Sequence, residues 1–204
     1  MTRTEILAVA KPILFNTEMV MAILDGRKTV TRRCVKPKSK NAYGFFVAER
    51  VSDGAFIGVY DYDEEENAFD NPQKQPARTG DILYVRETWC KYDADHVIDG
   101  VRYAYKADAT PISEEARNEL GYKWKPSIHM PKEAARIFLR VTGVRVERLR
   151  DITVEQALKE GCVNPVRFDE LWNTTVKKSD LELYGWEANP WVWVIEFERI
   201  EVTK

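Results

Sequence analysis

Histidine is scarce in this sequence: only His96 and His129 occur among 204 residues. A serine–histidine–aspartate relay requires a histidine, and many zinc sites use one or more. A hydrolytic relay or a metal centre built on histidine is therefore not expected. We predict no metal ion and no cofactor.

Cysteine is also scarce, and Cys34, Cys90 and Cys162 are far apart in the chain. This odd number at these spacings fits neither a disulfide framework nor a zinc ligand set, and it favours a reducing compartment. No apolar run approaches the length of a membrane span, and residues 1–5 lack the basic and apolar regions of a signal peptide. We expect a cytoplasmic protein that does not enter a membrane.

An excess of one charge is absent as well, because 31 basic and 33 acidic residues give a formal net charge of −2. A protein that coats nucleic acid by bulk electrostatics needs a strongly basic surface. Any contact with nucleic acid must then come from a local basic patch. Internal repeats and low-complexity linkers are missing too, and the length predicts a single domain over residues 1–204.

Short apolar and β-branched segments dominate what is present, and helical patterns are few. Strands are expected at 12–15, 29–33, 45–48, 56–60, 82–85, 101–106, 137–149 and 191–197, and helices at 18–25, 113–120, 153–161 and 168–176. Residues 61–66 are expected to form a solvated acidic loop. The irregular order excludes the alternation of a doubly wound sheet. The predicted fold class is α+β, a mixed β-barrel with a few short helices.

The segment 26–33 reads GRKTVTRR and follows the first predicted helix. Gly26 is expected to end that helix, because glycine enters the left-handed conformation without steric cost. The β-branched residues that follow favour a strand, on which Thr31 and Arg33 would share a face, with Lys28 at the bend before it. A hydroxyl and two cations can form a reaction centre or an anion clamp. The alternative is a solvated turn whose cations offset the helix dipole.

Gly26, Lys28 and Arg33 also fit the Gly-x-Lys-x-x-Glu-x-Arg signature of the ASCH domain, and the chain resembles that family. The resemblance implies a β-barrel similar to the RNA-binding PUA domain. A Gly-Asp turn before a hydrophobic strand, at 80–85, is typical of the group. So is a strand followed by a threonine-capped helix, at 141–161.

The resemblance covers roughly half of the chain and includes a closing Ile-Glu-Phe strand at 194–197. Relative to the smallest members of the family, the stretches 37–78 and 90–125 are expected to be insertions. The whole pattern also resembles a longer set of proteins that are common in phages and prophages.

Thr31 stands where the general signature has glutamate, and this substitution marks small bacterial amidohydrolases of the superfamily that deacetylate N(4)-acetylcytidine. The resemblance implies catalytic roles for Lys28, Thr31 and Glu160. The Thr31 hydroxyl would attack the amide carbonyl, with Lys28 as its base once burial or a nearby cation favours the neutral amine. Glu160 would relay a proton to the leaving amine. This hydrolysis uses no metal.

A nucleoside substrate also needs an aromatic platform. Phe15 and Trp89 are the candidates for stacking against a base, and core packing is the alternative for both. Trp191 and Trp193 are expected to belong to the core.

Charged side chains would complete the substrate site. Arg33 is expected to hold a developing oxyanion or a phosphate, and Arg86 a phosphate. Glu87 would read a base edge or pair with Arg86. His129 is a candidate substrate contact, and a hydrogen-bonded structural histidine is its alternative.

Two other functions stay open. In an RNA-binding module without catalysis, Lys28, Arg33 and Arg86 would grip phosphate while aromatic rings stack an unpaired base. A ribonuclease is the other, because some ASCH proteins are reported to cleave RNA. Thr31 and Glu160 favour the hydrolase, because phosphate binding needs neither. The expected partner is a modified nucleoside or RNA, and the expected assembly is a monomer or a small homo-oligomer.

Overall fold

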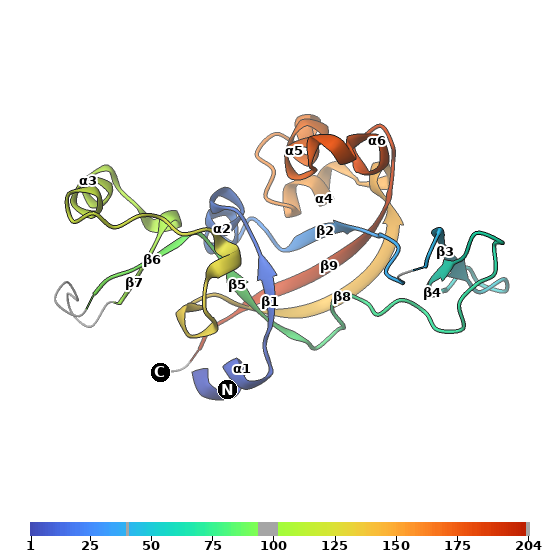
Figure 1. Cartoon of the computed structure of the whole chain (residues 1–204), viewed down its shortest axis with the longest axis horizontal. Helices are drawn as coiled ribbons and strands as arrows, with labels where there is room; N and C mark the ends of the chain where they lie inside the picture. Colours follow the sequence, from blue (N-terminus) through green and yellow to red (C-terminus); the bar gives the residue numbers. More distant parts are fainter. Residues whose placement is uncertain (40, 94–101, 203–204) are drawn as a thin grey trace. The chain divides into compact units, whose positions relative to one another are not determined.

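The computed structural model describes residues 1–39, 41–93 and 102–202 (Figure 1). The helices are α1 (Arg3–Val9), α2 (Thr17–Leu24), α3 (Pro111–Glu119), α4 (Val154–Lys159), α5 (Phe168–Thr175) and α6 (Leu181–Tyr184). The strands are β1 (Lys11–Leu14), β2 (Val30–Cys34), β3 (Gly44–Glu49), β4 (Phe56–Tyr62), β5 (Ile82–Arg86), β6 (Trp89–Lys91), β7 (Tyr103–Tyr105), β8 (Phe138–Arg148) and β9 (Trp191–Ile200).

Five strands form one mixed sheet in the order β1-β5-β8-β9-β2. β1 pairs with β5 in parallel, whereas β5 with β8 and β2 with β9 are antiparallel. The pairs β3–β4 and β6–β7 form separate antiparallel sheets. The prediction of an α+β fold with short helices is thus confirmed. None of the described helices combines the length and the apolar character needed to cross a membrane.

The chain divides into two compact units. Unit 1 comprises residues 1–29, 80–141 and 197–204, and unit 2 comprises residues 30–79 and 142–196. Strands β8 and β9 contribute residues to both units.

The core of unit 1 forms where α1 and β5 meet the segment before β8. Ile6 of α1 packs with Ile82 and Tyr84 of β5, and with Met130 and Phe138. Residues 82–85 of β5 are all buried, which explains their near-continuous apolar sequence.

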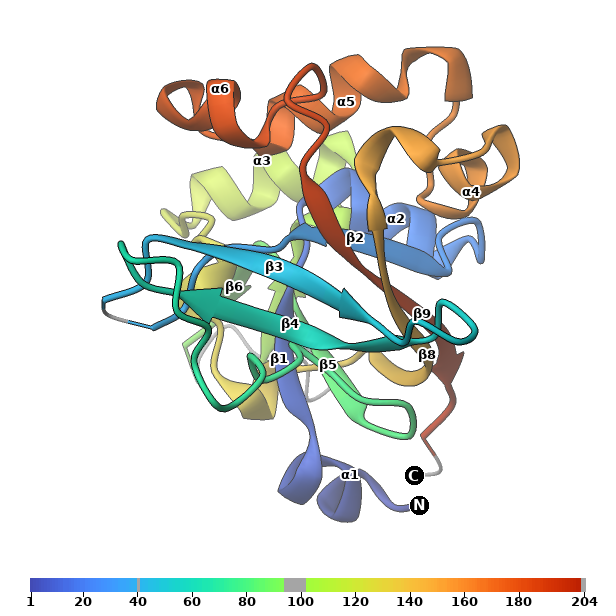
Figure 2. The same ribbon diagram turned by 90° about the vertical axis from the view of Figure 1, so that its right-hand side faces the viewer.

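Unit 2 has a hydrophobic cluster on each side of the β2–β9 pair. Val192 and Val194 belong to the cluster that includes Phe168 and Trp172 of α5. Trp193 belongs instead to the cluster with Val59 of β4. Because successive side chains of a strand point to opposite faces, helices α4 and α5 cover one face of this pair and the β3–β4 hairpin covers the other. Figure 2 shows both layers.

Two expectations about local structure are wrong. Helix α1 was not expected, although Thr2 and Glu5 form a capping box at its start. Residues 61 and 62 continue β4 rather than opening a solvated loop, and Asp61 is buried. Its carboxylate accepts hydrogen bonds from the backbone N–H groups of Lys38 and Ser39, at 3.0 and 2.7 Å, which compensates for the loss of water. The predicted strand at 101–106 begins at a residue outside the described ranges.

Candidate functional site

The turn that carries Lys28 belongs to unit 1 and forms as the sequence predicts. Asn16 begins α2, with its side-chain oxygen accepting a hydrogen bond from the N–H of Met19 at 2.8 Å. Gly26 follows the helix with φ of 76°, a conformation that favours glycine. The backbone N–H of Lys28 then donates to the carbonyl of Ala22 at 2.9 Å, which fixes the start of the outgoing chain.

The Lys28 side chain is buried beside an aromatic ring. The residue is 3% exposed, and its Nζ atom lies 5.5 Å from the centre of the Phe15 ring. Phe15 is itself buried and packs against Phe197, with ring centres 6.2 Å apart. Of the predicted site residues, the structure therefore brings Phe15 and Lys28 together. A cation over a buried ring gains a cation–π interaction, and burial disfavours its charge.

Glu87 and Trp89, two other predicted substrate contacts of unit 1, are part of its interior. Trp89 is buried in the core cluster, as its packing alternative expects. Glu87 is almost fully buried and binds Arg136 through two hydrogen bonds, of 2.9 and 3.0 Å. Burial raises the pKa of Glu87, and the Arg136 guanidinium opposes that shift. Glu87 thus pairs with Arg136, and the expected pair with Arg86 does not form.

Arg86 is half-buried and His129 is exposed, and both belong to unit 1. Arg86 donates a hydrogen bond to the carbonyl of Ile128, next to His129. His129 is exposed and ends a short 3-10 turn that starts at Ser127. These two residues are brought together, and their contact with a substrate stays a prediction.

Thr31 and Arg33 lie on β2, within unit 2. Thr31 is 2% exposed and faces Ile195 across the β2–β9 pair, whereas Arg33 is exposed and faces Trp193. Thr31 and Arg33 therefore share a strand face, as predicted, but they differ in access to solvent.

The residue between them, Arg32, is the centre of a buried polar cluster that we call the Arg32 cluster, formed by Arg32, Glu147, Gln156 and Glu160. The Arg32 side chain has no exposed surface. Its guanidinium donates to Oε1 of Glu147 at 2.6 Å, to Oε1 of Gln156 at 3.1 Å and to Oε1 of Glu160 at 3.2 Å. A buried charge is tolerated only when it is paired and hydrogen-bonded, and these three partners meet that condition.

Helix α4 supplies two of these partners because of how its ends are built. Thr153 and Gln156 form a capping box, in which the Thr153 N–H donates to Oε1 of Gln156 at 3.0 Å. Glu160 is the C-cap, and Gly161 follows it with φ of 84°. Arg32 thus contacts both the first turn and the C-cap of the helix.

The Arg32 cluster extends along β8. Arg145 donates from Nε to Oε2 of Glu147 at 2.9 Å and also binds Glu196. Cations and carboxylates alternate in this row, so the cluster carries no large excess of one charge. Arg32 leaves β2 on the face opposite to that of Thr31, and Glu160 is held on the Arg32 side.

Sequence reasoning missed Arg32 and Glu147 entirely. The one available signal is the alternation along β2, which places Arg32 on the same face as Val30, a core residue. An arginine at a core-facing strand position needs carboxylate partners, but nothing local in the sequence says which ones.

The described cysteines give a testable property of the interior. Cys34, Cys90 and Cys162 are free thiols, and burial raises the pKa of each. The thiolate is the reactive form, so a raised pKa lowers reactivity at neutral pH.

We expect slow alkylation of these cysteines by iodoacetamide at pH 7 in the folded protein, with a rate that still rises above about pH 9. Mass spectrometry counts the labels, and the unfolded protein in guanidinium is the control. A thiol that reacts at pH 7 as fast as free cysteine would contradict this.

Within the described part of the chain, no three His, Cys, Asp or Glu side chains gather closely enough to hold a metal ion. Comparison with family models, curated proteins and solved structures finds no match. A buried lysine can accept a proton and a buried threonine hydroxyl can act as a nucleophile. Glu160, held by Arg32, lies on the strand face opposite to that of Thr31.

Proposed function

We propose that this protein is a metal-free hydrolase that removes an acyl group from a modified nucleoside of the N(4)-acetylcytidine type, within a PUA-like barrel of the ASCH kind. The observation that supports it most is the burial of the Lys28 amine beside the Phe15 ring, because burial disfavours the charged form of a general base. Arg32 holds Glu160 on the strand face opposite to that of Thr31. The role of Glu160 as a proton relay, like the joint action of Lys28 and Thr31, therefore rests on the sequence motif.

The proposed reaction has two steps. The Thr31 hydroxyl attacks the acetyl carbonyl while Lys28 accepts its proton, and the carbon–nitrogen bond breaks as the amine of cytidine leaves with a proton relayed by Glu160. Water then hydrolyses the acetyl ester on Thr31 and returns the hydroxyl. Arg33, exposed on the same strand face as Thr31, is assigned to the oxyanion or to a phosphate.

The test is release of cytidine from N(4)-acetylcytidine, followed by chromatography. We expect the Lys28→Ala variant to lose at least about a hundredfold in turnover, because general base catalysis contributes on the order of 10²–10⁴. The matched control is Arg27→Ala, which removes the neighbouring exposed cation and its 2.9 Å ion pair with Asp25. It should retain turnover.

Absence of cytidine release by the wild-type protein would contradict the hydrolase and favour the RNA-binding module. A salt titration then becomes decisive, because phosphate-dominated binding weakens steeply with salt. Glu160→Gln should be examined for both turnover and thermal unfolding, since Glu160 also balances the charge of Arg32.

A further inference from the structure

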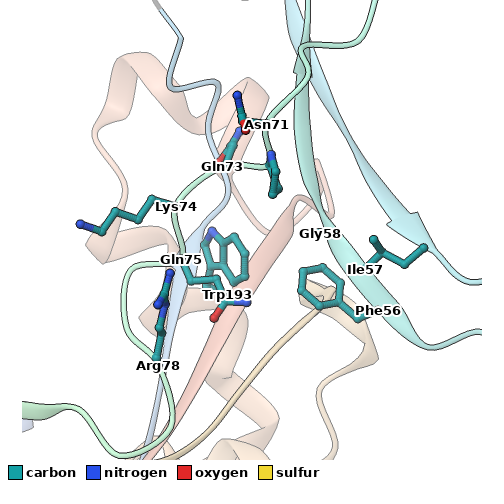
Figure 3. Close-up of a pocket in the computed structure, with 10 residues that line it drawn as sticks. Phe56, Ile57, Gly58, Asn71, Gln73, Lys74, Gln75, Arg78 and Trp193 are labelled. Carbon is teal, nitrogen blue, oxygen red and sulfur yellow. The ribbon is translucent and has the colours of Figure 1, made fainter.

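A cavity of about 520 Å³ lies within unit 2, beside β4 and the segment 71–78 that follows it. It is lined by two aromatic side chains, Phe56 and Trp193, and by polar side chains from the segment 71–78. Figure 3 shows the Trp193 ring between Phe56 on one side and Gln75 and Arg78 on the other. The volume falls in the range of about 300–1,000 Å³ that is usual for small-molecule sites.

Trp193, in the wall of this cavity, carries an unmatched hydrogen-bond donor. The residue is 2% exposed, and its Nε1 atom is buried with no hydrogen-bond partner among the described residues. Buried tryptophan N–H groups usually find an acceptor, so an unmatched one needs an explanation. In Figure 3 the nitrogen of the ring is on the side toward Gln73.

Gln73, in the same wall, carries an unmatched acceptor. The residue is 8% exposed, and its Oε1 atom is buried without a partner among the described residues. The orientation of the amide is determined, because Nε2 donates to the carboxylate of Asp61 at 2.5 Å and to the carbonyl of Lys36 at 3.2 Å. Both of those groups can only accept. Oε1 must therefore be the atom left for another donor.

Two cationic side chains complete the lining. Lys74 and Arg78 are exposed members of the same segment, and both line the cavity. The Phe56 ring lies edge-on to Trp193, with centres 6.0 Å apart and planes at 87°, so the two rings pack against each other in the wall of the cavity.

We propose that this cavity binds a free nucleoside monophosphate. A nucleobase offers a planar ring to Phe56, an acceptor for the unmatched Nε1 of Trp193 and an amino or imino donor for the unmatched Oε1 of Gln73. Its phosphate meets Lys74 and Arg78. The proposal does not rest on hydrolysis by Lys28, Thr31 and Glu160, because none of these residues lines the cavity.

Calorimetric titration of the full chain with the four common nucleoside monophosphates tests this directly. Ribose 5-phosphate and inorganic phosphate are the ligand controls, because they keep the charge and lack the base. We expect at least one nucleotide to bind, and ribose 5-phosphate to bind at least about tenfold more weakly, as expected for the loss of base stacking.

Variants then assign the binding to this cavity. Trp193→Phe removes the N–H and keeps an aromatic ring, and we expect about three- to tenfold weaker binding of the nucleotide. Lys74→Ala should weaken binding of the nucleotide more than that of the nucleoside, because only the nucleotide carries the phosphate. The matched control is Lys178→Ala, another exposed lysine of unit 2 that does not line the cavity. Thermal unfolding verifies that each variant is folded.

Three results would overturn the proposal. The first is that no nucleotide binds at millimolar concentration. The second is that ribose 5-phosphate or inorganic phosphate binds as tightly as the nucleotides, which identifies an anion patch only. The third is a single-stranded pentanucleotide that binds more than tenfold tighter than any mononucleotide, which identifies a nucleic-acid surface. Loss of cytidine release in the Thr31→Ala variant would not change the expected binding of nucleotides to this cavity.

Discussion

The Arg32→Met variant is expected to lose about 3–5 kcal/mol in its free energy of unfolding, the usual cost of removing one partner from a buried ion pair. The Arg32 side chain has no exposed surface, and its carboxylate partners Glu160 and Glu147 are only 8% and 15% exposed in their side chains. Methionine fills a similar volume and supplies no donor. Urea unfolding at neutral pH measures the difference.

The neighbouring residue gives a matched control. Arg33→Met removes the next arginine of the strand, which reaches the surface although burial lowers its pKa, and we expect a smaller loss than in Arg32→Met. An equal loss in both variants would mean that Arg32 stabilises unit 2 by packing alone.

The Thr31→Ala variant is expected to lose at least about a thousandfold in turnover of N(4)-acetylcytidine, in line with the removal of other catalytic nucleophiles. The hydroxyl is the nucleophile of the first step of the proposed reaction, in which the acetyl group leaves cytidine. Thr31→Ser keeps a hydroxyl and should retain measurable turnover. Cytidine release under saturating substrate, together with the KM, separates loss of chemistry from loss of binding.

Thr29→Ala is the matched control for Thr31, because it removes a second threonine of the same motif. It should retain turnover. Intact-mass measurement of the wild-type protein, quenched during turnover, should show a species heavier by one acetyl group, and peptide mapping should place it on Thr31. Turnover near the wild-type rate in Thr31→Ala would exclude an acyl-threonine intermediate.

Local signals predicted the elements around these residues well. Asn16 and Gly26 begin and end the region of α2, and Thr153 with Gln156 predicts the start of α4. These devices act within a few residues, so a sequence displays them completely. The central apolar strand at 82–85 was equally accessible, because a buried strand needs a continuous apolar run.

Arg32 was not predictable, because its partners come from β8 and α4. The distances along the chain to Glu147 and Glu160 are 115 and 128 residues. A composition of mixed charges offers many carboxylates, and only the sheet order selects these two. The motif, rather than any sign of burial, predicted Thr31 and Arg33 as site residues, and both lie on the strand face opposite to that of Arg32.

Asp61 shows the same limit in another form. It is one of several acidic residues in 61–66, and the charge run predicts solvent exposure. Only the three-dimensional position of the backbone at Lys38 and Ser39 makes burial of its carboxylate favourable. The core prediction for Trp193 was correct, yet the unmatched Nε1 atom of that residue depends on its neighbours in space.

The anchoring of α4 by Arg32 has a consequence for the order of folding. A helix of six residues is too short to persist by itself in water. Its Gln156 and Glu160 contacts require a residue from the first fifth of the chain, so the entropy of closing a very long loop must be overcome first. We infer that α4 becomes stable late, after β2 has joined β9, and that synthesis of the first half of the chain leaves Arg32 without its carboxylate partners until the second half emerges.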